Sequence, residues 1–186
     1  MKLIVGLGNP GQEYARHRHN VGFQCLNLLS KACLISIKQS QSKARVGMGQ
    51  MAGQPLLLAQ PQTYMNRSGE AVRLLAARHH LPPPDIIVLH DDLDLPLGRI
   101  RIRPGGGSGG HKGVASIIAA LGSQDFIRVR VGISRPPEEM ATEDYVLSPF
   151  APEEEAVMGE VRERVVQALL CLLDEGLEAA MNRYNT

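Results

Sequence analysis

A glycine-rich turn directly after the first apolar run constrains this chain more than any other stretch. The run Leu3–Val5 carries no charge, which is typical of a strand buried on both faces of an α/β sheet. Gly6, Gly8 and Gly11 follow, and glycine lets the backbone turn sharply with its N–H groups unobstructed. The apolar spacing beyond them predicts a helix over residues 12 to 32. Because open α/β sheets bind ligands at the carboxyl ends of their strands, this turn is a predicted binding region.

The three glycines also satisfy the spacing of a dinucleotide-binding fingerprint, G-x-G-x-x-G. That fingerprint needs an acidic residue about 20 positions further on, which binds the ribose hydroxyls. Residues 26–38 contain no aspartate or glutamate. The sequence therefore disfavours a dinucleotide site, and we predict no cofactor.

The rest of the chain alternates between strand and helix patterns, which predicts a single α/β domain over residues 1–186. Strands are predicted at 44–50 and 56–60, joined in a hairpin around Gly53, and at 86–89, 99–103 and 126–133. Helices are predicted at 68–80 with Ser68 as the cap, at 114–121 with Gly122 as the stop, and after Pro152. The buried stripe of the last helix is predicted to comprise Val157, Val161, Val165, Ala168 and Leu172.

Cysteine usage and hydropathy predict a soluble cytoplasmic protein. Cys25, Cys33 and Cys171 are odd in number, lack C-x-x-C spacing and lie among apolar residues, so we expect buried thiols in a reducing compartment. The chain has no leader pattern at its start and no apolar stretch long enough to span a membrane.

Charge is distributed unevenly along the chain. Residues 1–135 hold 17 lysines and arginines against 7 acidic residues, a balance of +10, whereas residues 136–186 hold 3 against 12, a balance of −9. A basic face built by the first part would suit a polyanion such as a nucleic acid. Aromatic residues are only 4% of the chain, so recognition of a nucleic-acid backbone is favoured over stacking along single strands.

Several polar side chains are predicted to meet at the ends of the strands. His19 and Asp91 follow buried strands that we expect to be neighbours, and a histidine held by an aspartate is a general base with a fixed tautomer. Asn9, Asn66 and the pair His111–Lys112 occupy similar positions in other loops. Ser108 sits in a loop of glycines instead of the strand-to-helix turn of a nucleophile elbow, so water is the predicted nucleophile.

Three sequence features resemble other kinds of site. His17 and His19 lie two positions apart and cannot chelate one metal from a helix. The segment HDDLD at 90–94 could bind Mg²⁺ through its carboxylates, although a solvated loop is more common. The loop GGGSGGHKG at 105–113 departs from a nucleotide phosphate loop, because His111 stands where that loop needs lysine. We therefore predict no metal.

An ordered set of motifs resembles bacterial-type peptidyl-tRNA hydrolase over nearly the whole chain. The motifs are GLGNPG with Tyr14 and RHN at 18–20, PQTYMNRSG at 61–69, HDDLDLPLG at 90–98, GGGSGGHKG at 105–113, FIRVRVGISRP at 126–136 and the terminal NRYN. The resemblance implies a monomeric domain with a mixed twisted sheet surrounded by helices. It also implies hydrolysis of the ester between a stalled peptide and the terminal ribose of tRNA, without a cofactor.

The resemblance also assigns roles to individual residues. It implies that His19 is the base, that Asp91 holds it, and that Asn9 helps to distinguish a peptide-like amide from a free amine. Substrate binding is implied or predicted for a larger set, namely Asn9, Tyr14, Tyr64, Met65, Asn66, His111, Lys112 and Tyr145. Arg103 and Arg130 match a basic pair that binds phosphate at the end of the acceptor stem, next to the CCA end.

Two positions depart from the family pattern. The family usually has threonine where His17 stands and asparagine where Lys112 stands. A non-catalytic branch of the same fold binds RNA as a splicing factor, so an RNA-binding module is the alternative function. Asn9, His19, Asn66 and Asp91 are all present, which favours the hydrolase.

Overall fold

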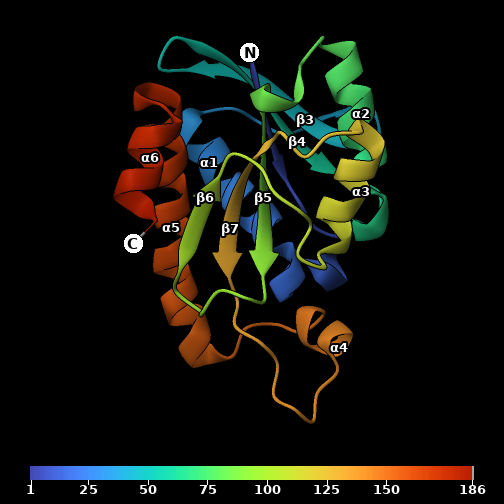
Figure 1. Cartoon of the computed structure of the whole chain (residues 1–186), viewed down its shortest axis with the longest axis vertical. Helices are drawn as coiled ribbons and strands as arrows, with labels where there is room; N and C mark the ends of the chain where they lie inside the picture. Colours follow the sequence, from blue (N-terminus) through green and yellow to red (C-terminus); the bar gives the residue numbers. More distant parts are fainter. Residues whose placement is uncertain (186) are drawn as a thin grey trace.

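One mixed β-sheet of seven strands runs through the molecule, seen here in a computed structural model (Figure 1). The structure describes residues 1–185; Thr186, the last residue of the predicted domain, lies outside the described residues. The strands are β1 (Lys2–Gly6), β2 (Gln39–Gln41), β3 (Ala44–Met51), β4 (Gln54–Pro61), β5 (Ile86–Asp92), β6 (Ile100–Arg103) and β7 (Ile127–Gly132). Their order is β2-β3-β4-β1-β5-β7-β6, which confirms the predicted α/β class and the mixed sheet.

The centre of the sheet is parallel and its two sides are antiparallel. β1 pairs in parallel with β4 and β5, and β5 pairs in parallel with β7. The hairpin β3–β4 and the pair β6–β7 are antiparallel. Gly6 of β1 is in register with Leu89 of β5, so the residues that follow these two strands emerge side by side at one edge of the sheet.

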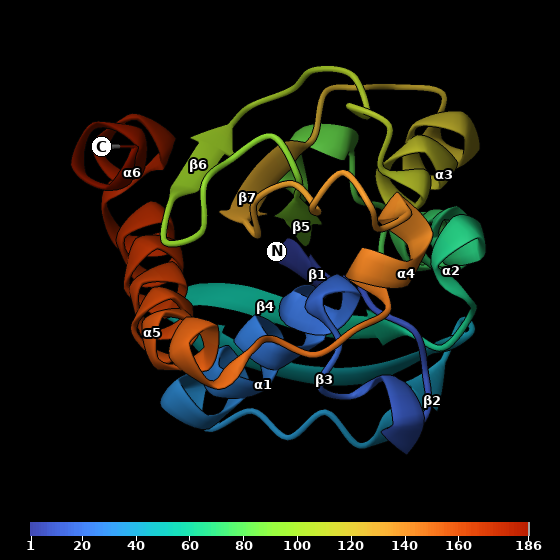
Figure 2. The same cartoon turned by 90° about the horizontal axis from the view of Figure 1, so that it is seen from below.

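Helices cover both faces of the sheet. α1 (Val21–Cys33), α5 (Pro152–Glu175) and α6 (Leu177–Tyr184) lie on one face, and α2 (Ser68–Arg78) and α3 (Lys112–Leu121) lie on the other (Figures 1 and 2). The short α4 (Thr142–Val146) lies beyond the carboxyl ends of β5 and β7 (Figure 1). Alternate residues of β1 are divided between two buried apolar clusters, with Ile4 facing α1 and Leu3 and Val5 facing α2.

The first helix begins later than its apolar spacing predicts. Residues 12–20 form two 3₁₀ turns, Gln12–Tyr14 and Arg18–Asn20, and α1 starts only at Val21. His17, between the turns, is extended with φ −70° and ψ 150°, which interrupts helical hydrogen bonding. The predicted start at residue 12 is therefore wrong, and the apolar periodicity holds only from Val21 onward.

Smaller differences concern caps, burial and two short helices. Ser68 does not cap α2, because its hydroxyl donates a hydrogen bond to the carbonyl of Met65. Val157 was predicted on the buried stripe of α5 but is 39% exposed. Cys25 and Cys171 are buried as predicted, whereas Cys33 is half-buried. The sequence also did not predict α4, which has five residues, or α6, which follows a turn at Gly176 with φ 101°.

No helix among residues 1–185 is long and apolar enough to cross a membrane.

Candidate active site

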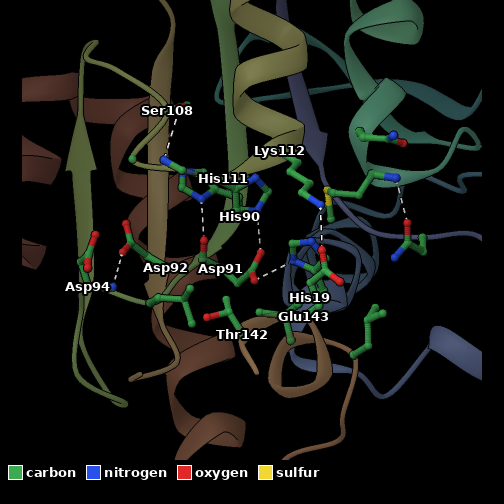
Figure 3. A pocket seen from close by; sticks show the side chains of 18 of the residues that line it. His19, His90, Asp91, Asp92, Asp94, Ser108, His111, Lys112, Thr142 and Glu143 are labelled. Atoms are coloured by element: carbon green, nitrogen blue, oxygen red, sulfur yellow. Dashed lines mark hydrogen bonds and ion pairs between the residues drawn. The ribbon is translucent and has the colours of Figure 1, made fainter. Parts of the chain in front are cut away.

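A cavity of about 470 Å³ opens where the carboxyl ends of β1 and β5 meet α3 and α4 (Figure 3). Its wall includes eight of the residues predicted to form the site, namely Asn9, His19, Tyr64, Met65, Asn66, Asp91, His111 and Lys112. Tyr14, Tyr145, Arg103 and Arg130 do not line it. The other side of the cavity is formed by the segment after β5, by α4 and by the residue that follows α4, and it includes Leu93, Val146 and Leu147.

His19 and Asp91 are hydrogen-bonded to each other at the base of this cavity. Nδ1 of His19 lies 2.8 Å from Oδ2 of Asp91, and the side chains are 13% and 2% exposed. His19 stands in the 3₁₀ turn just before α1, which packs very closely on the strands. A Cβ atom on Gly22 would come within 2.6 Å of backbone atoms of Leu7 and Leu89, so only glycine permits this approach. The close approach brings His19 to the carboxyl end of β5.

A second imidazole donates to the other oxygen of Asp91. Nε2 of His111 lies 2.8 Å from Oδ1 of Asp91. Nδ1 of His111 accepts hydrogen bonds from the backbone N–H groups of Gly113 (3.1 Å) and Val114 (3.2 Å), which makes it the N-cap of α3. Since Nδ1 is an acceptor, the proton of this ring is on Nε2. Both ring nitrogens of His111 are therefore engaged within the protein.

The electrostatics of the pair favour its charged forms. Burial by itself lowers the pKa of His19, but the charge and hydrogen bond of Asp91 outweigh burial and raise the pKa above its ordinary value. Burial raises the pKa of Asp91, yet His19 and His111 together lower it well below its usual range. Burial, and then the neighbouring His111, lower the pKa of His90 to about 3, so His90 is a neutral packing group. Its ring lies edge-on to that of His111, with centroids 4.8 Å apart.

His19, Asp91 and His111 lie close enough together to be considered as metal ligands. The hydrogen bonding of His111 does not fit that role. A metal on Nε2 would require the proton on Nδ1, where it would face two backbone N–H donors. The donor set therefore fits a hydrogen-bonded triad better than a metal centre.

Asn9 is held in place by two segments. Its backbone N–H donates to Oδ1 of Asn20 and its carbonyl accepts from Nδ2 of Asn20, both at 2.9 Å. Its side-chain Oδ1 accepts from the backbone N–H of Met65 at 2.8 Å. The Nδ2 group of Asn9 is then the part of this amide left to donate toward the cavity. Sequence reasoning missed the role of Asn20, because a side chain that fixes a neighbouring turn leaves no periodic signal.

Tyr64, Met65 and Asn66 enter the cavity wall from the turn before α2. Met65 is buried, while Tyr64 and Asn66 are exposed to the opening. Tyr14 lies outside the wall but packs edge-to-face on Tyr64, with ring centroids 6.4 Å apart. It also packs edge-to-face on His17 at 5.5 Å. These rings form one aromatic group beside the cavity mouth.

Tyr145 is buried next to the site and does not line the cavity. It is 6% exposed, and its hydroxyl donates to the carbonyl of Ile133 at 2.5 Å. The guanidinium of Arg18 lies over its ring, 4.2 Å from the centroid. The predicted contact of Tyr145 with substrate does not match this position, because its polar atom is used inside the protein.

Lys112 spans the cavity mouth. Its Nζ lies 3.2 Å from Oε1 of Glu143 in α4, and both side chains are largely exposed (Figure 3). Its charge opposes protonation of His19, since it lowers the pKa that Asp91 raises. The departure from the family pattern therefore places a cation close to the histidine.

Four arginines share one face of β6 and β7. Arg101 is in register with Arg130, and Arg103 with Arg128. Arg128 is buried and donates to the carbonyls of Gly107 and Gln124, and burial followed by its arginine neighbours lowers its pKa to about 10. Arg101 and Arg103 are exposed, whereas Arg130 is half-buried and donates from Nε to Asp92 at 2.5 Å. We call Arg101, Arg103 and Arg130 the arginine face.

An α/β sheet that holds a histidine–aspartate pair and amide donors in an open cavity defines a hydrolytic enzyme that activates water. The family model described as peptidyl-tRNA hydrolase matches residues 3–186. A peptidyl-tRNA hydrolase of Dehalococcoides mccartyi is 49% identical and one of Chloroflexus aggregans is 47% identical; each match covers all of this chain and at least 99% of the relative. The solved peptidyl-tRNA hydrolase of Acinetobacter baumannii superimposes with a TM-score of 0.94 at 36% identity, covering 100% of this chain and 95% of that one. The chain therefore belongs to the peptidyl-tRNA hydrolase family, which confirms the resemblance seen in its motifs.

Proposed function

We propose that this chain cleaves the ester of peptidyl-tRNA with a water molecule that His19 deprotonates. The reaction is the one for which the family is named, hydrolysis of peptidyl-tRNA, and the relatives found carry the same name. The alternative of a non-catalytic RNA-binding module finds no support among them. Released peptide and free tRNA are the products, so the enzyme recycles tRNA from stalled translation.

The hydrogen bond between His19 and Asp91 is the observation that carries this mechanism. With the Nδ1 proton directed at the carboxylate, the only lone pair of the His19 ring is on Nε2. His19 lines the cavity, where Nε2 can accept a proton from water. Asp91 sets the tautomer and stabilises the imidazolium that forms.

The proposed reaction balances with water as the sole co-reactant. Nε2 of His19 accepts a proton from water as the oxygen bonds to the ester carbonyl carbon. Asn66 donates a hydrogen bond to the oxyanion that forms. When the intermediate collapses, the bond from carbon to the ribose oxygen breaks, and His19 returns the proton to that oxygen.

Asn9 supports selection of peptidyl over aminoacyl substrates. Its Oδ1 is occupied by Met65, so it presents donor hydrogens to the cavity. A peptide carbonyl accepts such a bond, whereas a free ammonium group has only donors and would leave Asn9 unpaired. The apolar side of the cavity at Leu93, Val146 and Leu147 offers room for the peptide.

The remaining predicted residues divide between the mouth and the wall of the cavity. Tyr64, Met65 and Lys112 line it and are proposed to contact the substrate near its ester. Tyr14 acts through its packing on Tyr64. His111 has no free ring nitrogen for substrate, because Nε2 donates to Asp91 and Nδ1 accepts from the backbone of α3.

The arginine face is proposed to bind the acceptor stem of the tRNA. Arg103 is exposed and Arg130 is oriented by its bond to Asp92, so two guanidinium groups are available to bind phosphate. The CCA end would then extend toward His19. We further propose that the enzyme acts as a monomer in the cytoplasm, consistent with its three free thiols.

Incubation with N-acetyl-aminoacyl-tRNA and with the unblocked aminoacyl-tRNA tests this function. We expect cleavage of the blocked ester and much slower cleavage of the free one. Equal rates on the two substrates would contradict the proposed role of Asn9, and absence of cleavage of the blocked ester would contradict the activity.

A further inference from the structure

We infer that His111 is a positioning residue that fixes the carboxylate of Asp91 so that its second oxygen faces His19. The inference rests on the proposed function, because it assigns a role within the same reaction. It replaces the predicted contact of His111 with substrate. His111 acts through Asp91 and does not touch the reacting atoms.

The contacts of Asp91 carry this inference. Its Oδ1 accepts from His111 and its Oδ2 accepts from His19, each at 2.8 Å (Figure 3). The side chains of Asp91 and His111 are 2% and 9% exposed, so water has little access to this carboxylate. A carboxylate held by one donor can rotate about its last bond, but one held by two donors on opposite oxygens cannot turn without losing both bonds.

The N-terminus of α3 fixes the orientation of His111 in turn. The backbone N–H groups of Gly113 and Val114 both point at Nδ1, which leaves Nε2–H as the donor to Asp91. The edge of His90 packs on the same ring. The ring is therefore oriented from two sides, and the helix sets both its position and its tautomer.

Loss of the Nε2–H donor has a defined electrostatic consequence. Oδ1 of Asp91 would be buried without a donor, and the negative charge would act on His19 alone. The imidazolium would become more stable, so His19 would release its proton only at higher pH. The other histidine and charged side chains that line the cavity are His90, Asp92, Asp94, Lys112, Arg135 and Glu143. Burial is the main cause that lowers the pKa of His90 and keeps it neutral, and none of these six side chains is itself altered by a substitution at His111.

Two substitutions separate this role from simple capping of α3. His111→Asn places an amide oxygen near the position of Nδ1, so it retains the cap but loses the donor to Asp91. His111→Gln places an amide N–H near the position of Nε2, so it retains the donor but weakens the cap. A positioning role predicts that glutamine rescues catalysis, whereas a capping role predicts that asparagine does.

The test measures kcat/KM against pH for wild type and both variants with N-acetyl-aminoacyl-tRNA, alongside thermal unfolding. We expect His111→Asn to melt near wild type, to lose roughly tenfold in kcat and to show an acidic limb displaced to higher pH. His111→Gln should keep most of the rate and the wild-type limb despite a lower Tm.

The inference would be overturned if His111→Asn kept both the wild-type kcat and the wild-type position of the acidic limb of kcat/KM. It would also be overturned if that acidic limb were displaced in His111→Gln. Should His111→Asn not fold, the limb of His111→Gln decides alone. Failure of the proposed function is distinguishable, because the wild type would then show no cleavage or no acidic limb. An active wild type with an unmoved limb in His111→Asn contradicts only the role of His111.

Discussion

Nδ1 of His19 lies 2.8 Å from Oδ2 of Asp91, although the two residues are 72 positions apart in the chain. They meet because β1 and β5 are adjacent parallel strands, and because glycine at position 22 allows α1 to begin directly on those strands. The result is an imidazole whose tautomer and orientation are set by a buried carboxylate. The proposed catalysis depends on that relationship.

The pH dependence of kcat/KM should report the titration of His19. The free base is the active form, so activity falls as pH decreases through its pKa. Asp91 raises that pKa above the ordinary value of about 6.5, despite the opposing effect of burial. We therefore expect an acidic limb centred above pH 6.5, measured by initial rates from pH 5 to 9. An acidic limb of kcat/KM centred well below pH 6 would contradict the effect of the hydrogen bond between His19 and Asp91 on the pKa of His19.

Substitution of Lys112 tests the departure from the family pattern. Lys112→Asn should preserve or raise turnover, because asparagine supplies both a donor and an acceptor. Lys112→Ala should mainly raise KM, with a smaller loss in kcat. Each change also removes a charge that lowers the pKa of His19, so the acidic limb should move to higher pH. Steady-state kinetics at several pH values check this expectation.

Lys43→Ala is the matched control for the lysine substitutions. Lys43 forms an exposed ion pair with Glu70 at 2.9 Å, similar to that of Lys112 with Glu143, and does not line the cavity. Such exposed ion pairs contribute little to stability, so neither alanine variant should unfold at a much lower temperature than wild type. If kcat and KM are the same for wild type, Lys112→Asn and Lys112→Ala, position 112 takes no part in substrate binding or catalysis.

Salt dependence of tRNA binding tests the arginine face. Each guanidinium that contacts phosphate releases counterions, so Arg103→Ala or Arg130→Ala should reduce the slope of log K against log salt by about one. Arg45→Ala is the control. Arg45 is exposed on β3, which lies near the opposite edge of the sheet from β6 and β7. Wild-type binding by both face variants at every salt concentration would place the tRNA elsewhere.

Chelation should leave hydrolysis unchanged. The hydrogen bonds of His111 do not suit a metal ligand, and the proposed mechanism needs only water and a base. We expect equal rates before and after dialysis against EDTA. Strong inhibition that added Mg²⁺ reverses would instead support a metal at the HDDLD segment.

The parts of the site that follow strands could be predicted from the sequence. Asp91 and the first glycine turn stand directly after uncharged apolar runs, and the carboxyl ends of adjacent parallel strands share one edge. The pairing of His19 with Asp91 follows from that geometry. The motifs added the substrate-binding role implied for Asn66 and marked Lys112 as a departure, neither of which follows from the position of these residues in loops.

Contacts that depend on side-chain geometry could not be predicted in this way. The sequence predicts a substrate contact for His111, because nothing in a glycine-rich loop reveals that the two ring nitrogens of His111 face Asp91 and α3. The late start of α1 has a similar cause. Asn20 bonds to the backbone of Asn9, an interaction specific to one turn that leaves no trace in the apolar spacing.

The most direct measurement of the central claim is single-turnover cleavage of N-acetyl-aminoacyl-tRNA by wild type, His19→Ala and Asp91→Asn. We expect His19→Ala to lose about 10²- to 10⁴-fold or more in the cleavage rate while it binds tRNA and unfolds like wild type. Asp91→Asn should lose less, because the base remains but its tautomer is no longer set. Cleavage by His19→Ala at nearly the wild-type rate would contradict the assignment of His19 as the base.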